Sequence, residues 1–466
     1  MKLTKIIKRI ILIYILYSIL TAVLLFAFHK SNKEIDTSYE KYFGQSKAND
    51  RALIIEERDF SAKAKIQIIE NAKDTLDISY YKIQSDEAGD LFFAKVIEAA
   101  NRGVSVNIVL DGKINKISND ISGLNYLLST NPNINIRYYE PLNLLMPWTF
   151  NNILHDKYII ADNKIAILGG RNIGNQYFDI NGESFLITND REVLIINTEV
   201  DDYTNSSIYQ ISKYFDEVFN SKYTKEVSPS NLNRMRKKAQ EKEIQLNIVK
   251  EKLQIEYPNL FNSNYDFLKM SVETNKITLI HNPIERLNKT PICWNVITSL
   301  MNNANNYILV QSPYIIPTNK MMNYIDYSNL ENKKVEMLTN SEFSTPNFFA
   351  FAGYLKYKKD LLNEDLDIYE YQGEGSIHAK SYIIDDNISI IGSFNMDSRS
   401  TYLSTETMLI IDSEDLVNQL NKKIDIIKND SILINEDVSN QKRPSIIKSI
   451  VLKIISIITY PFSYLL

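Results

Sequence analysis

The chain has 466 residues, of which 44% are hydrophobic and 11% aromatic, and its 52 Lys and Arg against 57 Asp and Glu give a net charge of −5. This length allows two or three domains, and the composition excludes an intrinsically disordered chain. The acidic balance is a poor match for a general nucleic-acid-binding protein, although it leaves room for a local basic cleft. The single cysteine, Cys293, excludes an intrachain disulfide and a cysteine-based metal cluster.

An uncharged run at residues 10–28 predicts a membrane-spanning helix, because its 19 residues would cover about 28 Å as a helix. The basic residues before the run are Lys2, Lys5, Lys8 and Arg9, and those after it are His29, Lys30 and Lys33. The excess before the run favours a cytoplasmic N-terminus and a catalytic part on the non-cytoplasmic side of the cell membrane. A cleaved signal peptide is the alternative, but the run is long for one and no small-x-small cleavage site follows it. We therefore expect residues 1–35 to form an uncleaved single-pass anchor.

Two series of helices and strands follow in the same order. The first series predicts helices at 60–72 and 89–102 and strands at 75–83, 104–110 and 134–139. The second predicts helices at 292–303 and 319–330 and strands at 307–314, 335–338 and 366–371. This repeated order predicts an α/β fold made of two duplicated halves, at 36–225 and 276–435.

Two further segments differ from these series. Residues 226–275 are expected to be a helical linker, because 233–256 is rich in Lys, Glu, Gln and Arg. The loop at 142–150 is apolar and interrupted by Pro147, so it is either core or a surface that touches acyl chains. Its Trp148 is a candidate substrate-binding residue.

The C-terminal residues 436–466 are expected to associate with a membrane. On a helical wheel of 445–460 the polar residues fall within about 140° of one another, and the remaining residues are Ile, Val and Leu. Such an amphipathic helix would lie in the membrane interface rather than span it. A helix docked on the domain is the alternative.

One motif occurs once in each half. Counting from His155 and from His378, a Lys stands at +2, an Asp at +7, a Gly at +14 and an Asn at +17 in both copies. The residues at these offsets are Lys157, Asp162, Gly169 and Asn172 in the first copy and Lys380, Asp385, Gly392 and Asn395 in the second. Two copies in register argue against a pair of ordinary core histidines.

The spacing predicts a β-hairpin that brings the Asn back toward the His and Lys, which share one face of the first strand. An imidazole can attack or move a proton, an ammonium supplies positive charge, and an amide donates hydrogen bonds. A phosphate diester needs these groups to be held and attacked.

The paired H-x-K-x4-D patterns, each with a downstream G-G/S-x-N, resemble the phospholipase D superfamily. Residues 169–174 and 392–400 are most similar to those of bacterial cardiolipin synthases, and the likeness covers most of 50–430. It implies that the two halves form one active site without a metal or cofactor. One His would form a phosphohistidine, the other would protonate the leaving alcohol, and the paired Lys and Asn residues would hold the phosphate oxygens.

Under this resemblance we expect His155 to be the nucleophile and His378 the general acid, with the reverse assignment as the alternative. Each His needs a carboxylate to fix its tautomer. We expect Glu406 to serve this role in the second copy and Asp190 in the first, with Glu192 in reserve. Asp162 and Asp385 are expected to support the motif loops.

Three functions follow from this interpretation. The first is a membrane-bound phosphatidyltransferase that makes cardiolipin from phosphatidylglycerol and a second phospholipid, or the corresponding hydrolytic phospholipase D that releases phosphatidic acid. The second is a superfamily nuclease, which the acidic charge and the apolar termini disfavour. The third is an inactive lipid-binding protein, which the intact motifs disfavour. We expect phospholipids and a membrane as partners, and no nucleic acid.

Overall fold

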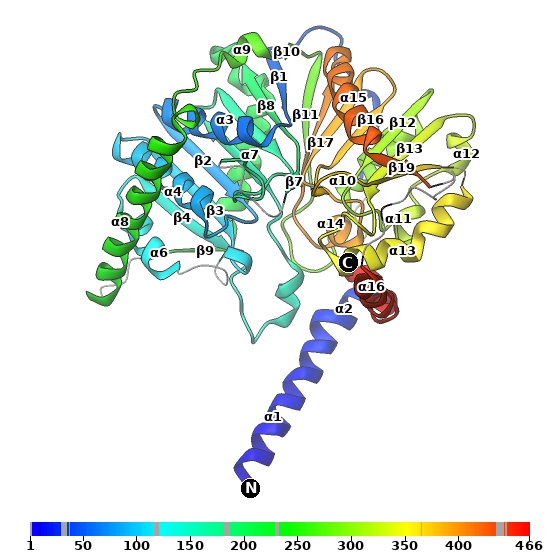
Figure 1. Ribbon diagram of the computed structural model, residues 1–466, viewed down its shortest axis with the longest axis horizontal. Helices are drawn as coiled ribbons and strands as arrows, with labels where there is room; N and C mark the ends of the chain where they lie inside the picture. The colour runs from blue at the N-terminus through cyan, green and yellow to red at the C-terminus, as the bar shows by residue number, and fades with distance from the viewer. Residues whose placement is uncertain are drawn as a thin grey trace.

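The computed structural model describes residues 2–28, 35–36, 38–115, 121–180, 187–228, 233–364, 366–434, 442 and 445–466. An apolar helix at the N-terminus leaves the base of a body that is built on two β-sheets with helices around them (Figure 1). His29, Lys30 and Lys33, which contribute to the expected charge asymmetry, lie outside the described residues.

The first half is built on a nine-stranded sheet with the order β10-β1-β8-β6-β5-β2-β3-β4-β9. Its strands are β1 (Asp50–Ile55), β2 (Thr75–Tyr80), β3 (Ser105–Asp111), β4 (Ile134–Tyr139), β5 (Lys157–Ala161), β6 (Ile165–Gly169), β8 (Glu192–Asn197), β9 (Thr224–Glu226) and β10 (Val272–Glu273). Its helices include α3 (Arg58–Asn71), α4 (Glu87–Asn101), α6 (Ile121–Thr130) and α7 (Ser207–Phe219). The sequence predicts α3, α4 and β2 to β4 to within a few residues at their ends, but β1 was not predicted.

The second half is built on an eight-stranded sheet with the order β11-β18-β17-β16-β12-β13-β14-β19. Its strands are β11 (Lys276–His281), β12 (Tyr307–Gln311), β13 (Lys334–Asn340), β14 (Asp367–Tyr371), β16 (Ser381–Ile384), β17 (Ile388–Gly392), β18 (Thr407–Asp412) and β19 (Ser431–Leu433). Its helices include α10 (Ile292–Asn302), α11 (Asn319–Met322), α12 (Tyr327–Leu330), α13 (Phe348–Asn363), α14 (Ser398–Tyr402) and α15 (Glu414–Asn429). The single helix expected at 319–330 is wrong, because the Asp326 side chain caps a separate short helix by accepting the N–H of Ser328.

The two sheets repeat one topology, which confirms the predicted duplication. Strands β2, β3 and β4 run parallel, as do β12, β13 and β14. The predicted hairpins are β5 with β6 and β16 with β17, and each pairs with the neighbouring parallel strand in antiparallel fashion. The hairpin strands are almost wholly buried, so they read as continuous apolar runs rather than alternating ones.

The halves share a core that lies between the two sheets. One cluster of buried side chains draws Ile54, Ile160 and Ile195 from the first sheet and Ile383 and Ile411 from the second. A short parallel pair, β7 (Thr188–Asn189) with β15 (Ser376–Ile377), also joins the halves directly before the second motif. These contacts fix the two motif hairpins relative to each other.

Helix α8 (Asn233–Glu256) lies where the sequence predicts a helical linker, and it also packs along the first half. Its buried Ala239, Leu246 and Leu253 face that half, and Lys242 pairs with Asp90 of α4 at 2.6 Å. The segment is therefore part of the first half's surface as well as a connection between the halves.

The N-terminal helix consists of α1 (Lys2–Ile19), a π-helical turn, η1 (Leu20–Leu24), and α2 (Leu25–Phe28). Its stretch Leu3–Ala27 is long and apolar enough to cross a membrane, a property that signal sequences share. The C-terminal end of this helix is hydrogen-bonded to the body. Asn151 Nδ2 donates to the carbonyl of Ala22 at 2.7 Å, and Asn288 Nδ2 donates to the carbonyl of Phe26 at 3.0 Å. Tyr17 also donates to the carbonyl of Leu145 at 3.0 Å, so the loop before His155 touches this helix.

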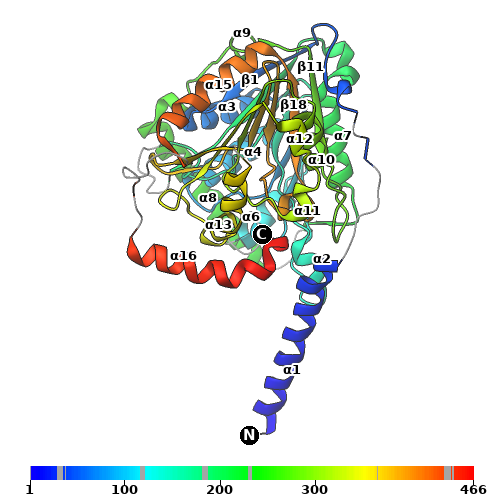
Figure 2. The same ribbon diagram turned by 90° about the vertical axis from the view of Figure 1, so that its right-hand side faces the viewer.

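The C-terminal helix α16 (Ile446–Thr459) lies across the base from which α1 emerges (Figure 2). Leu452 and Thr459 are buried against the body, and Lys448 Nζ donates to the carbonyls of Phe343 and Thr345. The outward face carries the exposed side chains of Ile446, Ile447, Ile450, Ile454 and Ile457. The helix is thus docked on the domain and at the same time presents an apolar face to its surroundings.

Candidate active site

Both motif histidines line one cavity of about 360 Å³ at the junction of the two halves. His155 stands two residues before β5 and His378 three residues before β16, so neither lies on its strand. Their side chains are 13% and 18% exposed, respectively. Asn172 and Asn395 line the same cavity, so the hairpins return the asparagines to the histidines as the spacing predicts. The cavity is also lined by Tyr81, Tyr177, Tyr314, Phe349, Arg399 and Leu466.

Each imidazole is held by a carboxylate from the opposite half. His155 Nδ1 donates to the Glu406 oxygens at 2.9 and 3.0 Å, and His378 Nδ1 donates to Asp190 Oδ2 at 2.5 Å. The assignment of one carboxylate to the His of its own copy is therefore wrong, although both acids are at the site. The reserve candidate Glu192 binds Lys65 Nζ at 2.6 Å instead and contacts neither imidazole.

A small residue at +15 in each motif makes room for these carboxylates. Ser393 donates its hydroxyl to Glu406 Oε2 at 2.5 Å. At the equivalent position, Gly170 leaves space for Asp190, since a Cβ there would come within 2.4 Å of Asp190 Oδ1. Any larger side chain at Gly170 would push Asp190 away from His378.

The motif lysines are buried beside the histidines. Lys157 Nζ donates to the carbonyl of His155, and Lys380 Nζ donates to that of His378. Burial lowers the pKa of Lys157 to about 7 and that of Lys380 to about 8. An anionic group in the cavity would favour the charged form of both lysines.

The two His–carboxylate pairs differ in charge. Burial, with the nearby Lys157, holds the pKa of His155 well below its usual range, and burial with Lys380 lowers that of His378 to about 4. Burial alone would raise the pKa of Asp190, but His378 and Lys380 hold it well below its usual range. Burial raises the pKa of Glu406 well above its usual range. The carboxylate beside His378 is therefore the one that keeps its negative charge more firmly.

The asparagine side chains have unused hydrogen-bonding capacity at the cavity wall. Asn172 Nδ2 donates to the Tyr177 hydroxyl at 3.1 Å. The Oδ1 atoms of Asn172 and Asn395 are buried without a hydrogen-bond partner among the described residues. The tyrosine rings stand edge-on to the imidazoles, Tyr81 at 4.9 Å from His155 and Tyr177 at 5.8 Å from His378 between ring centroids.

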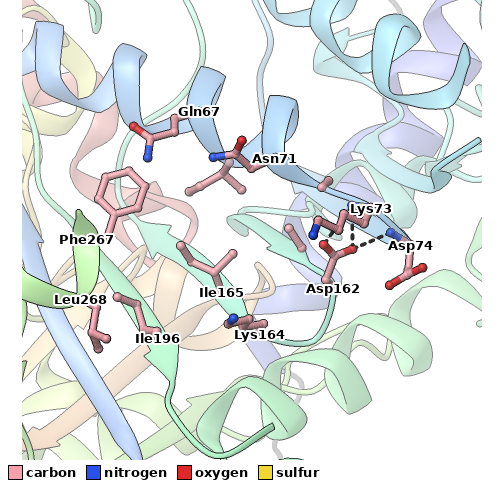
Figure 3. A pocket seen from close by; sticks show the side chains of 13 residues that line it. Gln67, Asn71, Lys73, Asp74, Asp162, Lys164, Ile165, Ile196, Phe267 and Leu268 are labelled. Carbon is pink, nitrogen blue, oxygen red and sulfur yellow. Dashed lines mark hydrogen bonds between the residues drawn. The ribbon is translucent and has the colours of Figure 1, made fainter. Parts of the chain in front are cut away.

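The motif aspartates lie away from this cavity. Asp162, at φ 53°, accepts hydrogen bonds from three backbone N–H groups at the start of β2, those of Lys73, Asp74 and Thr75. Asp385, at φ 52°, does the same at the start of β12, where it accepts from Asn305, Asn306 and Tyr307. Figure 3 shows Asp162 at a separate cavity of about 520 Å³ beside α3, whose described lining includes neither motif histidine. Both aspartates thus fasten the turn of a motif hairpin to the start of a neighbouring strand.

Trp148 is not among the described residues that line the cavity. It lies on the 3-10 helix η3 (Pro147–Asn151), half-buried against the core of the second half. The exposed leucines of this loop are Leu142, Leu144 and Leu145, at 47%, 58% and 80%. The position of Trp148 does not support the expected contact with substrate.

Sequence reasoning missed several residues that line the cavity, among them Arg399 and Leu466. Arg399 is present in the second motif copy alone, and its Nη2 donates to the carbonyl of Leu465 at 2.6 Å while its N–H donates to that of Leu466 at 2.7 Å. The unmatched Arg at +21 was a usable signal, since the first copy has Asn175 nearby but no Arg at that offset. Nothing in the sequence places Leu466 at the site.

The sequence and the fold are similar to those of known proteins. The family model described as cardiolipin synthase, PLD-like domain, matches residues 66–208 and 297–427, one segment in each half. The chain is 28% identical over 405 residues to cardiolipin synthase C of Escherichia coli (strain K12), covering 77% of this chain and 81% of that protein. It is 24% identical over 364 residues to a cardiolipin synthase of Staphylococcus aureus (strain Mu50 / ATCC 700699), covering 76% and 62%. Among solved structures, phosphatidylserine synthase of Haemophilus influenzae Rd KW20 shares the fold, with a TM-score of 0.61 and 16% identity over 89% of this chain and 95% of that one.

Proposed function

This chain belongs to the phospholipase D superfamily through its two cardiolipin synthase, PLD-like segments, and we propose that it is a membrane-bound phosphatidyltransferase that makes cardiolipin. The donor is phosphatidylglycerol and the acceptor is a hydroxyl of a second phospholipid. The observation that carries this proposal is the pair of crossed His–carboxylate contacts in one cavity. Two imidazoles, each with Nδ1 engaged, leave two Nε2 atoms for chemistry on a single phosphate.

The reaction proceeds in two balanced steps. Nε2 of neutral His155 attacks phosphorus, the bond from phosphorus to the glycerol oxygen breaks, and protonated His378 gives its proton to that oxygen. The acceptor hydroxyl then gives its proton to His378 while its oxygen attacks phosphorus, and the phosphorus–nitrogen bond breaks. At the end of the cycle His155 is neutral and His378 is protonated, as at the start.

The two carboxylates support this assignment of roles. A nucleophile must be neutral, and the pKa of His155 is held well below its usual range by burial and Lys157. A general acid must hold a proton. Burial and Lys380 lower the pKa of His378 to about 4 in the empty site, whereas the ionised Asp190 and an anionic substrate both favour its imidazolium form, so His378 takes up its proton with the substrate. The reverse assignment would pair the acid with Glu406, whose raised pKa makes it the weaker anion.

The lysines and asparagines would hold the non-bridging phosphate oxygens. Lys157 is the first residue of β5 and Lys380 directly precedes β16, in opposite halves, and Asn172 and Asn395 line the same cavity. Charge that grows on these oxygens in the transition state would be offset by ammonium groups already in place. This arrangement needs little rearrangement at the moment of reaction.

Three apolar features at one end of the molecule support a membrane substrate. The N-terminal helix and α16 lie at the base (Figures 1 and 2), and α16 carries exposed isoleucines. The loop before His155 carries exposed leucines, and its Leu145 carbonyl accepts a hydrogen bond from Tyr17 of the N-terminal helix. Anchoring there would keep acceptor lipid concentrated and water scarce at the cavity, which favours transfer over hydrolysis. We further propose that the basic residues before the apolar run stay in the cytoplasm and that the body lies on the other side of the cell membrane.

Lipid extraction tests the proposal in cells. Cells without other cardiolipin synthases should accumulate cardiolipin when they express this chain and should not when they express its His155→Asn variant. An increase in phosphatidic acid without cardiolipin would favour a hydrolytic phospholipase D instead.

A further inference from the structure

A third cavity, distinct from the catalytic one and from the one at Asp162, lies on the opposite side of α14 from the catalytic cavity. Its volume is about 480 Å³. The lining includes Phe26 at the end of the N-terminal helix, Lys320 of α11, Lys356 of α13, Tyr402 of α14 and Ser463 near the C-terminus. Residues that are far apart in the sequence therefore meet at this one place at the base of the molecule, where Figure 2 shows α2, α11, α13 and the C-terminus together.

The charge of this cavity suits an oxyanion. Lys356 Nζ donates to the Ser463 hydroxyl at 3.1 Å, and Lys320 Nζ stands 4.1 Å over the Tyr402 ring. The hydroxyls of Thr318 and Ser398 also lie in the lining, where they are hydrogen-bonded to each other at 2.9 Å. Asp360 also lines the cavity, so the lysines outnumber the carboxylate by two to one. Ammonium and hydroxyl groups together are the usual partners of a phosphate.

The cavity lies where the apolar helix meets the body. Phe26 is 4% exposed, and its carbonyl accepts a hydrogen bond from Asn288 Nδ2 at 3.0 Å. On the other side, the Tyr464 hydroxyl donates to the carbonyl of Val23 at 3.2 Å. If Leu3–Ala27 spans the bilayer, a cavity that touches Phe26 and Ala27 is at the depth of the phospholipid headgroups.

We propose that this cavity binds the phosphate headgroup of an anionic phospholipid whose acyl chains lie along the N-terminal helix, as a second lipid site distinct from the catalytic cavity. The proposal rests on the membrane association proposed above but not on the reaction. Ser398 and Tyr402, one helical turn apart, line this site, whereas Arg399 and Ser400 of the same helix line the catalytic cavity. A lipid held here would therefore contact the outer side of the wall that carries Arg399.

Native mass spectrometry of the full-length chain in non-ionic detergent can count bound lipids. The background is His155→Asn, which prevents turnover, and the probe is dioctanoyl-phosphatidylglycerol. We expect two bound molecules. Lys320→Gln with Lys356→Gln should leave one and weaken the lost site by at least about tenfold, since each lysine gives a charge-assisted hydrogen bond.

The matched control replaces two exposed lysines outside both cavities, Lys359 and Lys422, by Gln. It has the same net charge as the test variant and should bind two lipids. The molecule that remains on the test variant reports that its fold and catalytic cavity are intact.

Competitors identify the ligand. Inorganic phosphate, sn-glycerol 3-phosphate and dioctanoyl-phosphatidylcholine should each fail to displace the second phosphatidylglycerol, because they lack either the acyl chains or the net negative charge. A test variant that still binds two lipids would overturn the proposal. Displacement by inorganic phosphate as effective as that by the lipid would show an oxyanion site that is not a lipid site. Because this experiment measures lipid binding and not turnover, neither result confirms or contradicts the proposed reaction.

Discussion

Glu406, in the second half, accepts a hydrogen bond from His155, in the first half, at 2.9 Å. Conversely, Asp190, in the first half, accepts a hydrogen bond from His378, in the second half, at 2.5 Å. Neither half therefore contains a complete His–carboxylate pair, and the two halves must be docked before either imidazole is oriented. The shared core between the sheets fixes that docking.

The first prediction concerns these two carboxylates as positioning residues. Glu406→Gln and Asp190→Asn should each lower kcat by about 10²- to 10⁴-fold, because an amide can no longer hold the Nδ1–H tautomer that leaves Nε2 free. KM should change little, since neither carboxylate faces the cavity. Steady-state kinetics measures both parameters. A loss confined to KM, or a collapse of the melting temperature, would indicate a binding or purely structural role.

The covalent step should be asymmetric between the histidines. His378→Asn should still form a labelled phosphatidyl adduct with a substrate that carries a good leaving group, because such an alcohol needs little help from an acid. The adduct should be stable to base and labile to acid, and His155→Asn should form none. An adduct on the His155→Asn protein instead would reverse the assignment of the nucleophile.

The pH dependence follows from the lysines. Burial lowers the pKa of Lys157 to about 7 and of Lys380 to about 8, so the empty site loses positive charge as the pH rises through this range. Because kcat/KM reports the free enzyme, the loss of lysine charge should make it fall more steeply between about pH 7 and pH 9, in addition to the decline that His378 imposes above its pKa of about 4. The value of kcat should persist to higher pH, since bound phosphate favours the protonated forms of these groups. A kcat/KM that stays constant up to about pH 10 would contradict this account of the lysines.

The outward face of α16 should bind membranes without contributing to the fold. Replacing Ile450, Ile454 and Ile457 by Ser should weaken binding to phosphatidylglycerol vesicles by at least about tenfold, because each buries apolar area in the interface. Turnover of detergent-dispersed substrate should be unchanged. The buried Leu452 is the contrasting position, since Leu452→Ser should lower the melting temperature. Equal binding of wild type and the triple variant in vesicle flotation would rule out an interfacial role for this face.

The motif spacing predicted the two hairpins because each copy has two short apolar runs on either side of a turn, at an exact repeat. That the two hairpins meet was implied by the resemblance to the phospholipase D superfamily and not by the spacing. The crossing of Glu406 and Asp190 could not be predicted, since it depends on how the halves dock and not on distance along the chain. The strands β1 and β11 were missed because short apolar runs at the start of each half resemble helical segments. The part played by Leu466 could not be foreseen either, because a C-terminal apolar residue has no pattern that relates it to Arg399.

The most direct test of the proposed function is to measure what resolves the intermediate. Purified protein in phosphatidylglycerol vesicles, alone or with a second phospholipid, should convert most of the donor to cardiolipin and release one glycerol for each transfer. The physical reason is that the apolar base of the molecule would keep acceptor lipid close and water scarce at the cavity. Cardiolipin as the main product, with a matching amount of released glycerol, is the predicted result. Phosphatidic acid as the dominant product with every acceptor lipid would contradict transfer and establish hydrolysis.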